Sequence, residues 1–156
     1  MKSKVNILIV GGTGFIGYHL AKKSLKKGWE VTSISSNPPP QKRYLKKVKY
    51  MICDITKNKS LRKSIKEHYK YVVNLGGYVD HTHKKKTFDS HYKGCKNLTK
   101  IFLEKPPTAF VQMGSSVEYG NLKSPQKENL KCKVLSNKSI YGKAKLLSSS
   151  YLLISS

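Results

Sequence analysis

A chain of 156 residues with 38% hydrophobic content suits one domain with a single core. Its longest apolar runs, such as Val5–Val10, have the length of a strand and are well short of the ~18 residues that cross a bilayer. The net charge of +23 lies along the whole chain, with arginine only at Arg43 and Arg62. We therefore predict no membrane partner. We interpret the charge as a lysine-rich composition that attracts anionic ligands, and keep a nucleic-acid or other polyanion partner as the alternative.

The start of the chain and its cysteines indicate a reducing compartment. Met1–Lys4 leads directly into the first apolar run without a cleavage site, so we expect no signal peptide. Cys53, Cys95 and Cys132 are an odd number of cysteines without CxxC spacing. This pattern is typical of free thiols rather than of a structural disulfide. We therefore expect a cytoplasmic protein.

Hydrophobic runs alternate with helical patterns along the chain, which is typical of a parallel α/β sheet. In chain order, the first half predicts a strand at Lys4–Val10, a helix at Gly14–Lys27, and strands at Glu30–Ser35 and Val48–Cys53. The second half predicts a helix at Asn58–His68, a strand at Tyr71–Leu75, a helix at Thr87–Glu104 and a strand at Ala109–Met113. A polar loop, Gly114–Asn137, precedes a final helix that contains Tyr141.

Right-handed crossovers between these strands give the sheet order 3-2-1-4-5. The predicted fold is a Rossmann-type doubly wound parallel sheet, and residues 1–156 form one domain. In such sheets, ligands bind in the crevice above the carboxyl ends of the strands, here strands one and four.

A glycine-rich turn joins the first predicted strand to the first helix. Gly12, Gly14 and Gly17 form a GxGxxG pattern, and Gly11, Gly14 and Gly17 form an overlapping GxxGxxG. The first glycine permits the tight turn, the middle one lets a pyrophosphate approach, and the last permits close packing of helix on strand. The helix N terminus presents N–H groups and a positive dipole end to phosphates. We therefore predict that a dinucleotide contacts the whole turn: Gly11, Gly12, Thr13, Gly14, Phe15, Ile16 and Gly17.

The end of the second predicted strand is expected to contact the adenine ribose. The chain has Ser35 and Ser36 there, where an acid would favour NAD. No acid repels a 2′-phosphate at this point, and Lys42 and Arg43 follow nearby. The predicted cofactor is therefore NAD or NADP, and the residues favour NADP slightly. Asp54, at the end of the third strand, either contacts the adenine or caps a helix or turn, and the sequence leaves both roles open.

A hydroxyl, a phenol and an ammonium group follow the fifth predicted strand. Tyr141 and Lys145 are four residues apart, so they share one face of a helix and can reach one ligand. An ordinary tyrosine, with a pKa near ~10, is a poor base at neutral pH, but a nearby cation favours its phenolate. Such a tyrosine can exchange a proton with a substrate alcohol. Ser115, just past the strand, is placed to hydrogen-bond the substrate oxygen and the phenol.

Taken together, these motifs resemble the extended short-chain dehydrogenase/reductase family, which contains nucleotide-sugar epimerases, dehydratases and reductases. The resemblance covers essentially the whole chain, and the motifs follow the order of that family. They are Gly-Gly-Thr-Gly-Phe-Ile-Gly at 11–17, Cys-Asp-Ile at 53–55, Asn-Leu-Gly-Gly at 74–77, Gly-Cys-Lys-Asn-Leu at 94–98, Gly-Ser-Ser-Val-Glu-Tyr-Gly at 114–120 and Tyr-Gly-Lys-Ala-Lys at 141–145.

The resemblance implies roles for individual residues. Ser115, Tyr141 and Lys145 would be the catalytic triad, and Tyr141 and Lys145 would also contact the cofactor, Lys145 at the nicotinamide ribose. Asp54 and Ile55 would flank the adenine. The resemblance further implies a nucleotide-sugar substrate and a homodimer that packs through the helix of Tyr141 and the helix before the fifth strand. Residues that would line the cofactor after the fourth strand are Leu75, Gly76 and Gly77.

The chain departs from the family pattern at three places and in length. Gly76 and Gly77 stand where the family usually has alanines, His91 stands where it usually has an asparagine, and Ser35 replaces the frequent acid. Family members are much longer, and the additional part supplies most of the sugar-binding domain. Two hypotheses therefore stay open: an NAD(P)-dependent epimerase, dehydratase or reductase, and an NAD(P)-binding module without turnover.

Two other chemistries are not predicted. His81 and His83 have no third ligand nearby and are followed by lysines, so we interpret them as part of a solvated loop and predict no metal. Ser115 is not enclosed in a GxSxG pattern, which disfavours a hydrolase nucleophile.

Overall fold

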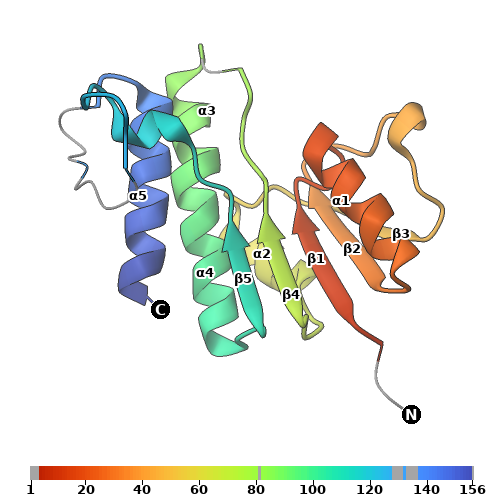
Figure 1. Ribbon diagram of the computed structural model, residues 1–156. Coiled ribbons are helices and arrows are strands. Elements are labelled where there is room, and N and C mark those ends of the chain that lie inside the picture. The colour runs from red at the N-terminus through yellow and green to blue at the C-terminus, as the bar shows by residue number, and fades with distance from the viewer. Residues whose placement is uncertain (1–3, 81, 128–131, 133–136, 156) are drawn as a thin grey trace.

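Five parallel strands form the sheet at the centre of the computed structural model, which describes all residues except 1–3, 81, 128–131, 133–136 and 156. Their order is β3-β2-β1-β4-β5, which confirms the doubly wound topology predicted from the sequence. Every neighbouring pair is parallel, so the segments that follow the strands meet at one edge of the sheet (Figure 1). The strands are β1 (Asn6–Val10), β2 (Glu30–Ser35), β3 (Val48–Ile52), β4 (Tyr71–Asn74) and β5 (Ala109–Gln112).

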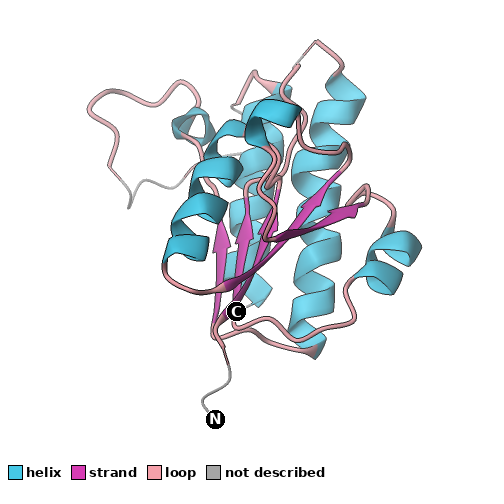
Figure 2. Cartoon of the chain, turned by 90° about the vertical axis from the view of Figure 1, so that its right-hand side faces the viewer, coloured by secondary structure: helices cyan, strands magenta, loops and turns pink. Residues whose placement is uncertain are grey.

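Helices lie on both faces of this sheet (Figure 2). One face packs against α1 (Phe15–Lys26), and the other packs against α2 (Asn58–Ser64) and α4 (Gly94–Glu104). The last helix, α5 (Ile140–Ser155), packs beside α4. Among the described residues, no helix combines the length and the apolar character that spanning a membrane requires.

Strand β1 lies at the centre of the core, because successive side chains of a strand point to opposite faces of a sheet. Leu8 and Val10 belong to the apolar cluster that contains residues of α2 and α4, whereas Ile7 and Ile9 belong to the cluster that contains Ala21 of α1. All four strand side chains are almost completely buried. Burial on both faces explains the continuous apolar run of this strand.

The helix predicted at Thr87–Glu104 begins earlier and is not uniform. It starts with α3 (Lys84–Phe88), continues through a π-helical turn, η2 (Asp89–Lys93), and ends as α4. π-Helical turns are rare in proteins, and those that occur are often found at functional sites. This turn contains His91, which is only 8% exposed.

Two further segments differ from the prediction. The helix expected to reach His68 ends at Ser64, because Ile65 has already left the helical conformation and both Ile65 and Tyr69 are buried in the core. Their burial outweighs the helical propensity of the charged residues between them. The predicted polar loop after β5 contains a short 3₁₀ helix, η3 (Ser116–Tyr119).

Candidate functional site

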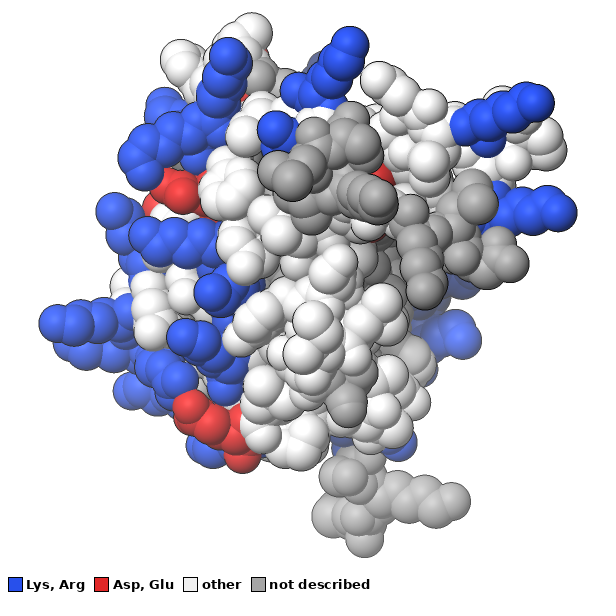
Figure 3. Space-filling view, turned by 90° about the vertical axis from the view of Figure 1, so that its left-hand side faces the viewer, with Lys and Arg blue, Asp and Glu red and all other residues white. Residues whose placement is uncertain are grey.

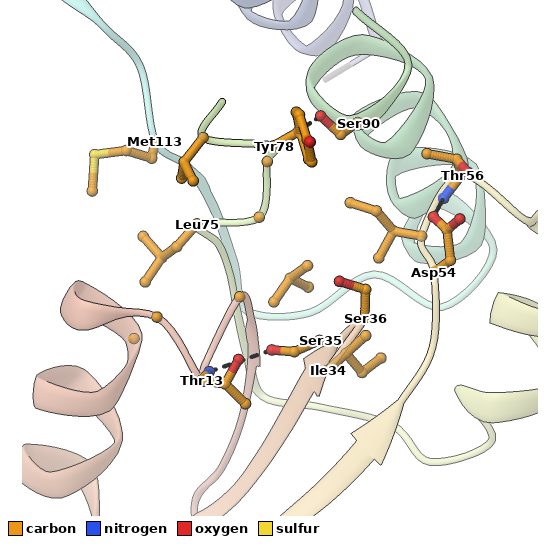
Figure 4. A pocket seen from close by; sticks show the side chains of 18 of the residues that line it. Thr13, Ile34, Ser35, Ser36, Asp54, Thr56, Leu75, Tyr78, Ser90 and Met113 are labelled. Atoms are coloured by element: carbon orange, nitrogen blue, oxygen red, sulfur yellow. Dashed lines mark hydrogen bonds between the residues drawn. The ribbon is translucent and has the colours of Figure 1, made fainter. Parts of the chain in front are cut away.

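A cleft of about 700 Å³ opens at the carboxyl edge of the sheet (Figure 4). Its volume is in the range of sites that bind small molecules and cofactors. Of the residues predicted to contact a cofactor at the ends of strands one to four, all except Gly12 line it. They are Gly11, Thr13, Gly14, Phe15, Ile16, Gly17, Ser35, Asp54, Ile55, Leu75, Gly76 and Gly77.

The glycine-rich turn is packed too tightly for side chains at two positions. A Cβ atom on Gly17 would lie 2.3 Å from the carbonyl oxygen of Gly11, and a Cβ atom on Gly12 would lie 2.3 Å from Ser33 Oγ. Gly14 is the N-cap of α1, and within the described residues no side chain caps that helix end. The N terminus of α1 therefore faces the cleft with backbone N–H groups available to a ligand.

The end of β2 borders the same cleft. Ser35 Oγ accepts a hydrogen bond from the N–H of Thr13 at 3.3 Å, which ties the glycine-rich turn to the second strand. Ser36 follows, is exposed and also lines the cleft. The guanidinium carbon of Arg43 lies 6.0 Å from the centre of the Phe15 ring. Two hydroxyl groups therefore lie at this corner of the cleft, and Arg43 lies against Phe15, which lines it.

Asp54 lines the cleft beyond β3 and stabilises a turn. Its Oδ1 accepts a hydrogen bond from the N–H of Thr56 at 2.9 Å. Of the two roles that the sequence left open, the turn cap is therefore present in the structure. Next to it, the carbonyl oxygen of Ile55 accepts a hydrogen bond from Asn97 Nδ2 at 2.9 Å, which attaches this part of the cleft wall to α4.

Asn74, the last residue of β4, fixes the segment that follows it. Its Oδ1 accepts a hydrogen bond from the N–H of Gly76 at 3.0 Å, and its Nδ2 donates to Gln112 Oε1 at 2.7 Å. The Gln112 oxygen also accepts a hydrogen bond from Cys95 Sγ at 3.3 Å. Asn74 is 1% exposed, so these bonds satisfy a buried amide. Sequence analysis assigned Asn74 and Gln112 no role, although a polar residue at the end of an apolar strand was a signal.

The three residues predicted to be catalytic follow β5 in the chain, at the start of η3 and on α5. Ser115 is the N-cap of η3, where its Oγ accepts a hydrogen bond from the N–H of Val117 at 3.3 Å. Tyr141 and Lys145 both project from α5, and η3 packs against α5. Lys145 Nζ donates a hydrogen bond to the carbonyl oxygen of Met113. Ser115, Tyr141 and Lys145 are not among the described residues that line the cleft. Met113, whose carbonyl oxygen Lys145 bonds, does line it.

Lys145 is 4% exposed, and this burial lowers its pKa below the ordinary value of 10.5, against the opposing effect of the Glu118 carboxylate. Between the lowered pKa and 10.5, the unfolded chain binds a proton that the folded chain does not. We therefore predict that the cost of burying this charge is largest below the folded pKa and is relieved as pH rises towards 10.5.

The measurement is the free energy of unfolding of the wild-type protein minus that of a Lys145→Met variant, followed from pH 7 into the alkaline range. This difference is expected to become more favourable to the wild type as pH rises. Exposed Lys100 on α4 gives the matched control. Lys100→Met removes the same charge, but that charge is not buried, so no desolvation cost is removed with it. A difference that is flat with pH for Lys145→Met would contradict the prediction.

The sequence profile of the NAD dependent epimerase/dehydratase family matches residues 7–155. The chain belongs to this family. Membership confirms the resemblance to extended short-chain dehydrogenases/reductases that the motifs indicated. Epimerases and dehydratases of this kind use a dinucleotide, so the family accounts for a cleft whose base is a glycine-rich turn.

Individual relatives of this epimerase/dehydratase family member are distant and longer. A 3-beta-hydroxysteroid dehydrogenase of Mycolicibacterium neoaurum is 26% identical over 117 residues, which cover 70% of this chain and 32% of that protein. The UDP-glucose 4-epimerase of Thermotoga maritima, solved with UDP-glucose, has a TM-score of 0.86 at 21% identity, over 97% of this chain and 51% of that one. The Bordetella bronchiseptica enzyme WbmG, solved with NAD and UDP, has a TM-score of 0.86 at 18% identity, over 97% and 50%.

A third solved relative, the ADP-L-glycero-D-manno-heptose-6-epimerase of Helicobacter pylori, has a TM-score of 0.84 at 24% identity, over 99% of this chain and 53% of that one. At these identities the likeness shows a shared fold. The chain thus spans about half the length of the solved structures that it matches, and 32% of the curated relative.

Other residues of the cleft wall in this family member were not predicted from the sequence. Tyr78, Lys86 and Ser90 line the cleft there. Ser90 Oγ accepts a hydrogen bond from the N–H of Tyr78 at 2.9 Å, and Lys86 Nζ lies 5.6 Å from the centre of the Tyr78 ring. No local pattern pointed to them, because the helix predicted from the sequence began at Thr87 and Tyr78 lies in the segment after β4. His81 lies outside the described residues, and His83 is the exposed residue that precedes α3.

Proposed function

We propose that the cleft binds NADP(H) or NAD(H) and that the chain is the cofactor-binding part of an enzyme acting on nucleotide sugars. One observation carries this proposal. Residues from four separate segments were predicted from the sequence to contact a dinucleotide, and they line one cleft. Family membership supports the cofactor. The solved relatives that contain UDP-glucose, or NAD with UDP, support the class of substrate.

The glycine-rich turn fits a pyrophosphate. A Cβ atom built on Gly14 would meet the Gly11 carbonyl oxygen at 3.2 Å and no other described atom within 4 Å outside its immediate neighbours, so the cleft side of this residue is open. The first turn of α1 contains no acidic residue, and the chain as a whole has a net charge of +23. Both favour a dianionic ligand at this helix end.

In this proposal, Ser115, Tyr141 and Lys145 carry the proton transfer, and Tyr141 and Lys145 also contact the cofactor. A bound nicotinamide dinucleotide supplies the capacity to accept and return a hydride. The Tyr141 phenol exchanges a proton with the substrate hydroxyl. Ser115 Oγ accepts from Val117 and keeps its own proton to donate to the substrate oxygen. Lys145 adds the positive charge that favours a phenolate.

A binding module without turnover is the second candidate, because the chain spans only about half of the solved relatives. Both candidates predict cofactor binding, so turnover separates them. The chain is incubated with NAD⁺ or NADP⁺ and a panel of UDP- and ADP-sugars, and the sugars are analysed by NMR. A changed sugar supports the enzyme, whereas bound cofactor with every sugar unchanged supports the module.

The binding claim itself is tested by isothermal titration calorimetry of the purified chain with NADPH, NADP⁺, NADH and NAD⁺. We expect saturable binding of one of the two cofactor pairs at a single site. If none of the four dinucleotides gives a binding signal at millimolar concentration, both candidates are ruled out.

We propose further that NADPH binds more tightly than NADH, since hydroxyls and Arg43 border the ribose corner and no acid follows β2. Arg43→Ala is expected to weaken NADPH binding by about tenfold or more, because a hydrogen bond to a charged group contributes roughly 1.5–3 kcal/mol. NADH binding should change by much less. Lys100→Ala removes a positive charge from the exposed side of α4 and serves as the control for general attraction of anions. Equal losses for both cofactors would contradict this specificity.

We also propose a homodimer that packs through α5 and α4. No charged residue follows Lys145, and Leu153 and Ile154 near the end of α5 are 80% and 86% exposed. Figure 3 shows a strip without charged side chains on the face that α5 occupies, beside a band of basic side chains. Light scattering coupled to size exclusion should give a dimer, and Leu153→Asp should shift it towards the monomer, since a charge in an apolar interface is costly. A monomeric wild type at tens of micromolar would contradict the proposal.

A further inference from the structure

A glycine that lines the cleft, Gly77, and a histidine behind it, His91, compete for one volume. A Cβ atom on Gly77 would lie 1.9 Å from Cε1, 2.4 Å from Nδ1 and 2.7 Å from Nε2 of His91. The imidazole ring therefore occupies the space in which any other residue at position 77 would place its Cβ. Gly77 and His91 are also two of the places where the sequence departs from its family pattern, and the structure shows that these two departures are in contact.

The imidazole is held in this position from two sides. His91 belongs to the π-helical turn η2 and is 8% exposed. Its Nε2 lies 3.3 Å from the carbonyl oxygen of Tyr78, in the segment that follows β4. Its backbone carbonyl oxygen accepts a hydrogen bond from Ser148 Oγ of α5 at 2.9 Å. The ring is therefore bonded to the segment after β4, while the backbone of His91 is bonded to α5.

The same ring contacts the proposed acid/base. The His91 and Tyr141 ring centres are 4.8 Å apart, with an interplanar angle of 73°, which is the edge-to-face arrangement that aromatic pairs prefer. One turn further along α5, Lys145 is held at the Met113 carbonyl. The start of α5 is thus held at two points, by the aromatic contact of Tyr141 with His91 and by the hydrogen bond of Lys145 to Met113.

We propose that His91 is a positioning residue for Tyr141, and that Gly77 provides the space that this imidazole needs. The orientation of the phenol is restricted because a buried ring, supported by the segment after β4, packs against it. The role of Tyr141 as acid/base rests on the proposed function, whereas the packing of the three residues does not. The experiment below therefore needs neither cofactor nor substrate.

Coupling between the two positions is tested by thermal unfolding of four proteins: wild type, Gly77→Ala, His91→Asn and the double variant. Gly77→Ala should lower Tm by roughly 2–4 °C or more, the shift expected when overpacking costs about 1 kcal/mol in a chain of this size. In the His91→Asn background, where the shorter side chain leaves the space open, the same change should be neutral or stabilising. Equal Tm losses in the two backgrounds would overturn the shared volume.

Positioning is tested by ¹⁹F NMR of protein that contains 3-fluorotyrosine, with the Tyr141 signal assigned by Tyr141→Phe. In the wild type we expect a Tyr141 signal displaced from that of free 3-fluorotyrosine, because a packed ring has one preferred orientation. In His91→Ala, the signal should narrow and move towards the free value. His91→Phe keeps an aromatic ring and should retain most of the wild-type displacement.

The double variant Gly77→Ala/His91→Asn separates positioning from simple filling of space. Its Tm should recover, while its Tyr141 signal should remain that of a ring without its neighbour. If this variant, or His91→Ala, shows the wild-type Tyr141 signal, His91 fills space only and the proposal is wrong. Failure of all cofactor binding would contradict the proposed function and would leave these two readouts intact, so the two failures are distinguishable.

Discussion

Gly14→Asp is expected to weaken the binding of both NADPH and NADH by at least about 100-fold in a protein that remains folded. Gly14 is the N-cap of α1 and lines the cleft, so a carboxylate there would lie where a pyrophosphate binds. Two unit charges about 4 Å apart interact by roughly 4 kcal/mol near a protein surface. The same carboxylate would also occupy the N–H groups at the helix end.

Calorimetric titration gives the affinity, and circular dichroism at increasing temperature shows that the fold persists. Gly14→Asn is the matched control, since asparagine has almost the same shape and can cap the helix but carries no charge. It should lose much less affinity than the aspartate variant. Wild-type affinity in Gly14→Asp, or an equal loss in Gly14→Asn, would show that no phosphate binds at this helix end.

Gly17→Ala is expected to damage both binding and stability. The new Cβ atom would lie 2.3 Å from the Gly11 carbonyl oxygen and 2.6 Å from Gly12 Cα, and both are backbone atoms that cannot rotate away. The turn and α1 must separate, which we expect to cost about 3 kcal/mol. The corresponding fall in Tm is roughly 6–12 °C for a chain of this size. Cofactor binding should be lost because the turn no longer has the shape that admits a pyrophosphate.

Gly14→Ala provides the comparison, because it adds the same methyl group three residues earlier, where the closest contact is 3.2 Å. Differential scanning calorimetry and the cofactor titration are run on both variants. A small effect for Gly14→Ala beside a large one for Gly17→Ala is the expected pattern. Similar Tm values for the two variants would show that helix α1 is not packed on the turn as closely as described.

The sheet could be predicted from the sequence because its signals are local. The bounds of β2 agree with the predicted strand Glu30–Ser35, since the strand lies between the glycine that ends α1 and a proline loop. The strand order follows from the handedness of crossovers, which does not depend on side-chain detail. Helix α3 was missed because Lys84–Lys86 carries no apolar periodicity, and the π-helical turn depends on the tertiary packing of His91 against Tyr141 and Ser148.

The cleft could be predicted as far as its residues follow strand ends or belong to the glycine-rich turn. Tyr78 and Ser90 could not be assigned, because their hydrogen bond joins a loop to a helix 12 residues away. Asp54 illustrates the intermediate case, since its position was predicted while its hydrogen bond to Thr56 needed coordinates. The shared volume of Gly77 and His91 has no sequence signal beyond two unusual residues, because the contact exists only in three dimensions.

Main-chain hydrogen bonds join neighbouring strand ends at the base of the cleft. Beyond the regular ladder, the N–H of Gly11 donates to the Ile34 carbonyl at 2.7 Å, that of Leu75 donates to Val10 at 2.9 Å, and that of Met113 donates to Asn74 at 3.0 Å. Each strand end is thereby tied to its neighbour by groups that every amino acid except proline possesses. Because these bonds use no side chain, they place little demand on residue identity at the strand ends outside the glycine-rich turn, which fits a fold shared with solved structures at only 18–24% identity.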